Sequence, residues 1–205
     1  MKRNFFVITL MLLLSGLIFI PRIAAASDGP VGMLQSVADQ MIASLKAHKA
    51  TLKTNPSVVY SLAYKIVVPH ADLDVMAQHV LPPHTWASAS AGQRAEFKKE
   101  FTMLLVRTYA SALAEYSDQT IQFYPVRGGY AGQSGVKVNS VINRSDGPSI
   151  SVSYRVVNTG SQWKLFDMTV EGVSMLESFR SQFADQLSRG DINALIVTLR
   201  QHNNR

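Results

Sequence analysis

The side chain best placed for chemistry in this sequence is the carboxylate of Asp167. It lies in the stretch WKLFDMTVEGVSMLESFRSQF, where an apolar strand-like pattern gives way to a helical one. A carboxylate in an apolar pocket can act as a general base, because burial raises its pKa. No second polar group is arranged to complete an active site, so the pattern favours a structural ion pair with Arg180 or another cation at the edge of the sheet. We expect Asp167, Glu171 and Arg180 to pair near the corner where the strand meets the helix.

Metal-binding and nucleophilic chemistry have weaker support. His70, His79 and His84 include no pair four residues apart, and no carboxylate stands at a familiar ligand spacing from them. The segment Gly172-Val173-Ser174 does not extend to the G-x-S-x-G pattern of a serine nucleophile. The absence of cysteine excludes thiol chemistry and disulfides. We therefore expect no catalytic residue, no metal and no cofactor.

Residues 1–26 have the pattern of a secretory signal peptide. Lys2 and Arg3 precede an apolar run over residues 5–20, and alanines at 24–26 supply the small residues that cleavage requires. The alternative is an uncleaved anchor, but a proline and an arginine follow the apolar run and the chain then becomes polar. We expect residues 27–205 to form one exported domain with a sizeable core. Without a lipobox cysteine, this domain is expected to be soluble in the periplasm.

The charge pattern does not indicate a nucleic-acid partner. The full chain carries a formal net charge of +6, and part of this excess lies in the predicted signal peptide. No cluster of lysines or arginines stands out along the sequence. A mild positive charge of this kind suits anionic surfaces only weakly.

Hydrophobic periodicity predicts helices in the first half of the domain. One covers residues 33–45, and a second is opened by Asn55-Pro56 and runs to Ile66. A short third helix is capped by Asp72 and stopped by Pro82-Pro83. The longest begins at a capping box of Ser90 and Gln93 and continues to about Tyr116.

From Thr120 the hydrophobic period changes to two, which predicts strands. Their turns contain glycine, asparagine and proline, and such short connections require antiparallel neighbours. Two helices follow, with Gly190-Asp191 between them. The fold class is therefore α+β, with N- and C-terminal helices packed on a twisted antiparallel sheet of about four strands. The predicted strands lie near residues 121–123, 136–142, 150–156 and 163–170, and the last helices near 173–187 and 192–199.

Several segments, taken in order, resemble the MlaC family, the soluble phospholipid-binding proteins of the Mla system, also known as the toluene-tolerance auxiliary family. They are VVPHADLDVMAQHVL, EFTMLLVRTYASALAEY, WKLFDMTVEGVSMLESFRSQF and GDINALIVTLR. The resemblance covers nearly all of residues 30–200. One departure is Leu81-Pro82-Pro83, where the family pattern has a glycine after the Val-Leu pair.

The resemblance implies a phospholipid carrier of the periplasm and no enzymatic activity. Its fold would be an NTF2-like cone, with helices around a strongly twisted sheet and an apolar cavity for acyl chains. Its partners would be phospholipid, an inner-membrane Mla ABC-transporter complex and an outer-membrane lipoprotein–porin complex, with the carrier itself a monomer. Such a carrier would help to maintain outer-membrane lipid asymmetry. The only bound group would be the phospholipid itself.

We predict that lipid-contacting residues come from two helices and the sheet, although each has an ordinary core role as its alternative. Methionines such as Met76 and Met168 would suit a pocket that adapts to varied acyl chains. The predicted set is Leu73, Met76, Phe101, Leu104, Leu105, Thr108, Val138, Ile142, Val152, Tyr154, Phe166, Met168 and Val170.

Two other functions are also compatible with the sequence. One is a small enzyme on a similar cone fold, with Asp167 as general base toward a hydrophobic substrate. The other is an interaction module that holds another envelope protein through its basic face.

Overall fold

The computed structural model describes residues 29–55, 57–114, 119–145 and 147–204. The predicted signal peptide lies outside these residues. So do Pro56, the expected first residue of the second helix, and Tyr116, the expected end of the longest one.

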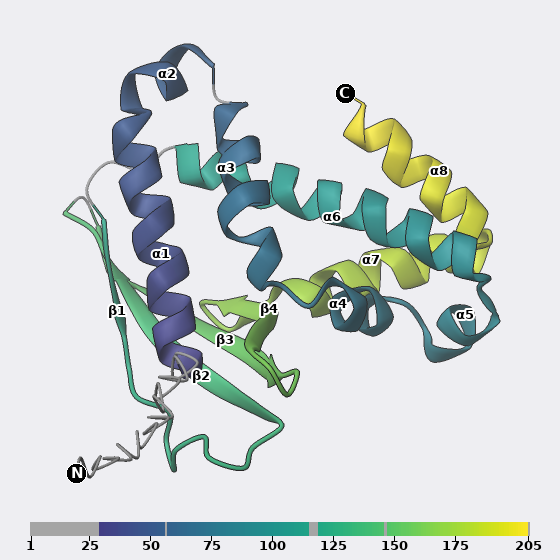
Figure 1. The fold of residues 1–205 in the computed structure, drawn as a ribbon. Coiled ribbons are helices and arrows are strands. Elements are labelled where there is room, and N and C mark those ends of the chain that lie inside the picture. The colour runs from purple at the N-terminus through teal and green to yellow at the C-terminus, as the bar shows by residue number, and fades with distance from the viewer. Residues whose placement is uncertain (1–28, 56, 115–118, 146, 205) are drawn as a thin grey trace, which may run out of the picture.

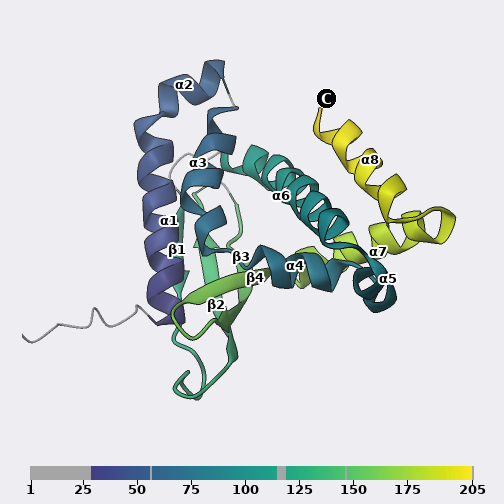
Figure 2. The same ribbon diagram turned by 45° about the vertical axis from the view of Figure 1, so that its right-hand side comes forward.

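Helices make up both ends of the described chain, and the sheet lies between them. The N-terminal helices include the long α6, and the C-terminal pair is α7 and α8 (Figures 1 and 2). Their bounds are α1 Pro30–Ala47, α2 Lys49–Thr54, α3 Val58–Ile66, the 3-10 turn η1 Val68–His70, α4 Leu73–Val80, α5 Pro83–Ser88, α6 Ala91–Ala114, α7 Met175–Arg189 and α8 Ile192–Asn203.

Side-chain caps fix several of these helix starts. Ser90 Oγ accepts a hydrogen bond from the backbone N–H of Gln93 at 3.2 Å, and Gln93 Oε1 accepts one from the N–H of Ser90 at 2.8 Å. This is the predicted capping box, which satisfies backbone donors that the first helical turn leaves free. The predicted caps Asp72 and Asp191 accept from the N–H groups of Val75 and Ala194 at 3.0 and 2.9 Å. The local sequence thus sets these boundaries correctly.

The sheet is antiparallel, with strand order β1-β2-β3-β4-β5. The predicted α+β class is confirmed, and a short fifth strand adds to the expected four. Its cause is the turn at Glu171 and Gly172, where both residues have positive φ values of 48° and 84°. Two consecutive positive φ angles are typical of a tight hairpin turn, so the chain pairs once more with β4 before its last helices begin. The strands are β1 Thr120–Phe123, β2 Gly135–Asn143, β3 Ile150–Asn158, β4 Trp163–Val170 and β5 Val173–Ser174.

Two short helices, α2 and α5, do not follow from hydrophobic periodicity. Pro82 and Pro83 do end α4, as expected, but Pro83 also occupies the first position of α5. Proline fits there because the first helical N–H has no intrahelical partner. The Leu81-Pro82-Pro83 segment is therefore a helix-to-helix connection.

The apolar core of the described residues falls into three clusters. α1 packs on one face of the sheet, and the same helix also packs with α3 and the second half of α6. The third cluster joins α4, α6, α7 and α8. Figures 1 and 2 show the sheet with α1 on one side of the molecule and α4, α5, α7 and α8 on the other, with α6 running from α3 toward α8.

Candidate functional site

The corner between β4 and α7 is organised by the buried carboxylate of Asp167, which is only 1% exposed. Its Oδ2 accepts hydrogen bonds from Arg155 Nη2 at 2.9 Å, from Arg155 Nε at 3.1 Å and from Ser174 Oγ at 2.8 Å. Its Oδ1 accepts from the backbone N–H of Leu176 at 3.1 Å, within the first turn of α7. Both carboxylate oxygens are engaged, and the acid ties β3, β4 and α7 together.

The predicted mutual pairing of Asp167, Glu171 and Arg180 is wrong. Asp167 pairs with Arg155, while Arg180 lies 3.8 Å from Glu177 on the exposed side of α7. Glu171 turns back to the sheet, where its side chain accepts a hydrogen bond from the N–H of Ser151. The reason is the cross-strand register, which places Arg155 directly opposite Asp167.

The position of Asp167 does not suit a general base. Its two oxygens already accept hydrogen bonds from a guanidinium, a hydroxyl and a backbone amide, so protein donors occupy the atoms that a general base would offer to a substrate. The neighbouring Tyr109 responds to this charge: burial raises the pKa of its hydroxyl, and the negative charge of Asp167 raises it further. Tyr109 packs edge-on against Phe179 of α7, at 6.3 Å between ring centroids. The arrangement is that of a structural ion pair.

A β-bulge in β4 decides which of its side chains face which cluster. Asp167 pairs with Arg155 and Leu165 with Val156, so Phe166 is an extra residue on β4. An extra residue shifts the alternation of a strand by one position. Leu165 and Met168 consequently pack in the same cluster, on the α1 side of the sheet, whereas Phe166 packs with the α4–α7 cluster.

Phe166 is held on that side by two neighbours. Its ring lies 5.6 Å from the imidazole of His79 on α4, and the guanidinium carbon of Arg155 lies 5.1 Å from its centroid. Of the predicted sheet residues, Phe166 is thus the one that the structure places apart from the others.

The face of the sheet toward α1 is almost wholly apolar. Val138, Val152, Tyr154 and Val156 are buried there beneath Met33 and Leu34 of α1. One polar pair interrupts the surface: the hydroxyls of Ser140 and Tyr154 lie 3.1 Å apart and bond each other. Burial raises the pKa of Tyr154, and the hydrogen bond from Ser140 opposes this effect. Because the two hydroxyls satisfy each other, the face offers no free polar group in this position.

Toward the end of the sheet that contains Ile142 and Ile150 this face is only half-buried, and we call that part the sheet wall; Val136 and Leu165, further along the strands, are half-buried as well. The sheet wall consists of Phe123, Ile142, Ile150, Met168 and Val170. Ile142 and Ile150 are direct cross-strand partners, and Val170 is opposite the buried Val152. Phe123 packs on Tyr154 at 5.5 Å between ring centroids. The wall therefore spans four strands, is apolar apart from the neighbouring pair of Ser140 and Tyr154, and is not completely covered by the helices.

The helical residues of the predicted lipid-contacting set lie elsewhere. Met76, Phe101, Leu104 and Leu105 are buried in the cluster of α4, α6, α7 and α8, and Leu73 packs against it. Thr108 is exposed on α6. The structure thus gathers Val138, Ile142, Val152, Tyr154, Met168 and Val170 on one face, and the helical residues form a second group.

Within the helical group, Phe101 belongs to a close-packed core of aromatic rings. Phe101 is 1% exposed, stacks on Phe97 at 5.7 Å and meets Phe179 and Phe183 edge-on at 5.5 and 5.7 Å. Such edge-to-face packing fills space efficiently. These side chains therefore have abundant protein partners, whereas those of the sheet wall have fewer.

Sequence reasoning missed Phe123 and Ile150 as members of the sheet wall. Both lie in predicted strands and alternate in step with predicted residues, so the period-two pattern could have identified them. It also missed Arg155 as the partner of Asp167. Only the register of β3 against β4 identifies this pair.

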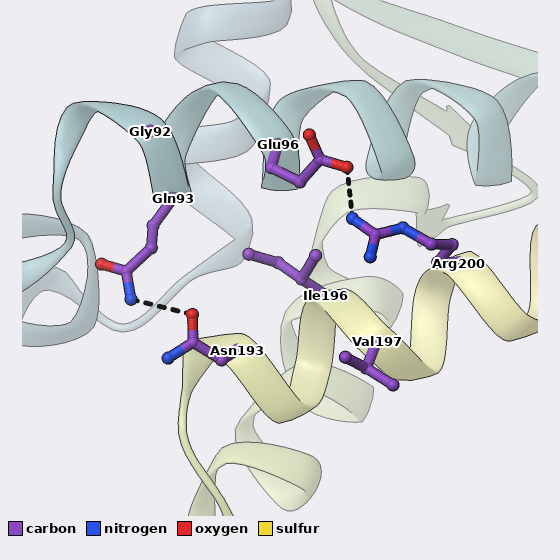
Figure 3. A pocket seen from close by; sticks show the side chains of 7 residues that line it. All are labelled: Gly92, Gln93, Glu96, Asn193, Ile196, Val197 and Arg200. Atoms are coloured by element: carbon purple, nitrogen blue, oxygen red, sulfur yellow. Dashed lines mark hydrogen bonds and ion pairs between the residues drawn. The ribbon is translucent and has the colours of Figure 1, made fainter.

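A separate shallow hollow of about 280 Å³ lies between α6 and α8. Figure 3 shows Ile196 and Val197 between two polar contacts, one from Gln93 Nε2 to Asn193 Oδ1 at 3.0 Å and one between Glu96 and Arg200. Small-molecule sites usually enclose about 300–1,000 Å³ with a mainly apolar lining. This hollow is smaller and has charged edges, so it is a weaker candidate for an apolar ligand than the sheet wall.

Within the described ranges, no group of three or more His, Cys, Asp or Glu side chains gathers as a metal site would require. His79 Nδ1 lies 2.9 Å from the carbonyl oxygen of Val75 on its own helix. None of the helices in the part of the chain that the structure describes has the length and hydropathy needed to cross a bilayer.

Comparison with known proteins gives one consistent family. A family model described as MlaC protein matches residues 35–201. The chain is 29% identical over 171 residues to the toluene tolerance protein ttg2D of Pseudomonas putida, covering 82% of this chain and 78% of that protein. It is 29% identical over 184 residues to the intermembrane phospholipid transport system binding protein MlaC of Haemophilus influenzae, covering 89% and 86%. A phospholipid-binding protein from Ralstonia solanacearum, solved in complex with a phospholipid, superimposes with a TM-score of 0.78 at 30% identity, covering 85% of this chain and 97% of the other.

Proposed function

The chain belongs to the MlaC family, and we propose that it is a soluble periplasmic carrier that binds phospholipid through the sheet wall. The bound state of the Ralstonia protein supports phospholipid as the ligand, because its fold and 30% of its aligned residues are shared with this chain. The predicted signal peptide supports the periplasm.

The sheet wall is the observation that carries the proposal. Each methylene group removed from water contributes about 0.8 kcal/mol, so an acyl chain of more than ten methylenes gains on the order of 10 kcal/mol from a dry apolar surface. Side chains such as Ile142, Met168 and Val170 supply that surface without any unpaired polar group nearby. The headgroup gains little from burial and can remain in solvent. We propose that the acyl chains lie against this wall.

The proposed transport step follows from the same energetics. A phospholipid cannot cross an aqueous compartment at a useful rate without a protein that covers its tails. We propose that the protein exchanges lipid with an inner-membrane Mla ABC-transporter complex and an outer-membrane lipoprotein–porin complex, and so maintains outer-membrane lipid asymmetry. It would act as a monomer with no cofactor and no enzymatic step.

Native mass spectrometry of protein purified without detergent tests the binding proposal. We expect the folded protein to carry a mass that collision releases as intact phospholipid. Protein that is empty and turns over a small hydrophobic carbonyl compound would instead support the enzyme. An empty protein in a stable complex with another envelope protein would support the interaction module.

The transport proposal needs a cellular measurement. In cells that lack the protein, we expect more phosphatidylethanolamine to react with an amine reagent that cannot cross the outer membrane. Unchanged labelling in such cells would contradict a role in lipid asymmetry, even if the protein binds phospholipid.

A further inference from the structure

The segment that forms the sheet is strongly biased toward positive charge. Between Asp118 and Asp167 the sequence contains a single acidic residue, Asp146. The same stretch contains five basic residues, Arg127, Lys137, Arg144, Arg155 and Lys164. The mild positive charge of the whole chain is therefore concentrated in one part of the fold.

Strand register brings three of these cations together. Lys137 on β2 is the direct partner of Arg155 on β3, and Lys164 on β4 is opposite Val157, two residues further along β3. They alternate with buried residues such as Val138 and Val156, so they point to the face of the sheet away from α1.

Folding stability does not account for this arrangement. Like charges on directly opposite positions of neighbouring strands are destabilising. Arg155 is compensated by Asp167, whereas the ammonium groups of Lys137 and Lys164 have no carboxylate partner among the described residues. Two uncompensated cations beside a third suggest that this face meets an anionic partner.

Exposed tyrosines lie at the same end of the sheet, in the loop 124–134 between β1 and β2. The loop ends next to Lys137, and the backbone N–H of Asn158 donates to the carbonyl oxygen of Ser134 at 2.8 Å. Tyr124 and Tyr130 are 41% and 44% exposed. Figure 1 shows this loop extending beyond the sheet, at the opposite end of the molecule from α2.

Tyr130 is exposed although its position is fixed. Its ring meets Trp163 edge-on, at 5.9 Å between centroids and 88° between planes. Its hydroxyl lies so close to Gly29, at the start of α1, that a Cβ atom there would be 2.5 Å away from the oxygen. The tyrosine is thus held on the α1 side of the sheet with one side left in solvent, whereas Lys137 and Lys164 point to the other face, so the two kinds of side chain meet only at this end of the sheet.

We propose that this end of the sheet, formed by Tyr124, Arg127, Tyr130, Lys137 and Lys164, docks on the anionic phospholipid surface of a bilayer. Tyrosine prefers the headgroup region, because its ring is apolar and its hydroxyl is polar. Lysine and arginine next to such a surface are attracted by the phosphates. The combination of exposed tyrosines with unpaired cations favours a bilayer over an acidic protein. The docking does not require a lipid in the sheet wall, so it can be tested separately from the carrier function.

Vesicle flotation of the purified protein tests this docking. We expect the protein to float with vesicles that contain phosphatidylglycerol and to remain behind with vesicles of phosphatidylcholine alone. Each lysine replaced should lower partitioning about fivefold, so the double variant Lys137→Gln/Lys164→Gln should lose most of its binding. Rising salt should release the wild-type protein, because salt screens exposed charges.

The matched control is Lys46→Gln/Lys49→Gln, which removes the same charge from exposed positions around the junction of α1 and α2. Its partitioning should equal that of the wild type, and circular dichroism should show all the proteins folded. An equal loss in both double variants would overturn the proposal, because net charge alone would then explain the binding. Wild-type protein that ignores both kinds of vesicle, or that binds an immobilised polyglutamate surface instead, would overturn it as well.

Discussion

Arg155 and Asp167 are direct cross-strand partners, and their side chains form an ion pair of 2.9 Å between Nη2 and Oδ2. The carboxylate is buried and the guanidinium is half-exposed. Because the carboxylate also accepts hydrogen bonds from Ser174 and from the N–H of Leu176, it links the sheet to the start of α7. The same arginine covers the ring of Phe166, the extra residue of the β-bulge. One pair therefore fixes strand register, bulge and helix entry together.

Removal of this carboxylate should destabilise the fold. Asp167→Ala leaves the half-exposed Arg155 without its partner and removes acceptors from Ser174 and the buried N–H of Leu176, so we expect a loss of about 1–3 kcal/mol in the free energy of unfolding. Denaturant unfolding measures it. The control Arg180→Ala breaks only an exposed contact and should cost less than about 1 kcal/mol. Equal effects of the two substitutions would contradict the role of Asp167 as the structural hub.

Polar substitution in the sheet wall should reduce lipid binding more than stability. Ile142→Ser and Ile150→Ser place hydroxyls on the half-buried apolar surface, so the double variant should carry less phospholipid per folded protein. Quantitative lipid extraction measures the load. The control Val197→Ser changes an exposed residue of α8 and should keep the wild-type load. A normal load in the double variant would argue against the wall as the acyl-chain surface.

Substitution in the aromatic core should reduce stability more than lipid binding. Phe101→Ala removes a ring that is packed against Phe97, Phe179 and Phe183, and such truncations typically cost about 3–5 kcal/mol. The fraction that remains folded should still bind phospholipid in the normal ratio. Native mass spectrometry of that fraction at low temperature is the measurement. Lipid-free but folded protein would place Phe101 in the binding site after all.

The buried hydroxyl of Tyr154 should make the fold sensitive to alkali. Its pKa is raised above the ordinary value of 10.0 mainly by burial, so the folded state retains the proton where the unfolded chain has lost it. By linkage, stability is complete below pH 10 and falls as the pH rises toward the folded-state pKa. Unfolding free energy measured as a function of pH should show this decline.

The matched variant for that experiment is Tyr154→Phe/Ser140→Ala, which removes both partners and leaves no buried hydroxyl unpaired. We expect it to show a weaker decline above pH 10. Some decline should remain, because the pKa of Tyr109 is raised as well. An unchanged slope would mean that Tyr154 does not contribute to the pH dependence.

Local signals in the sequence predict much of the fold. The capping box at Ser90 and Gln93, the caps at Asp72 and Asp191 and the alternation of β2 and β3 all lie within a few residues of the features that they determine. The fifth strand could not be predicted from such local signals. It depends on a positive φ at Glu171, which is uncommon for a residue other than glycine.

The site is harder to predict than the fold, because it depends on contacts between distant residues. The bulge at Phe166 changes the face on which later β4 residues lie, and its local sign is slight: the apolar positions shift phase between Leu165 and Phe166. The partner of Asp167 follows from register, which the sequence of one strand does not contain. Helical periodicity likewise identifies Phe101 as apolar without showing that three other aromatic rings enclose it.

The most direct test of the central claim is photocrosslinking with photo-methionine, which replaces methionine with little change in shape. Met168 lies in the sheet wall, whereas Met76 is 3% exposed in the helical core. After irradiation of lipid-loaded protein, peptide mapping should find phospholipid attached to the peptide that contains Met168 and not to the peptide that contains Met76. Attachment at Met76, with none at Met168, would contradict the claim that the acyl chains lie against the sheet.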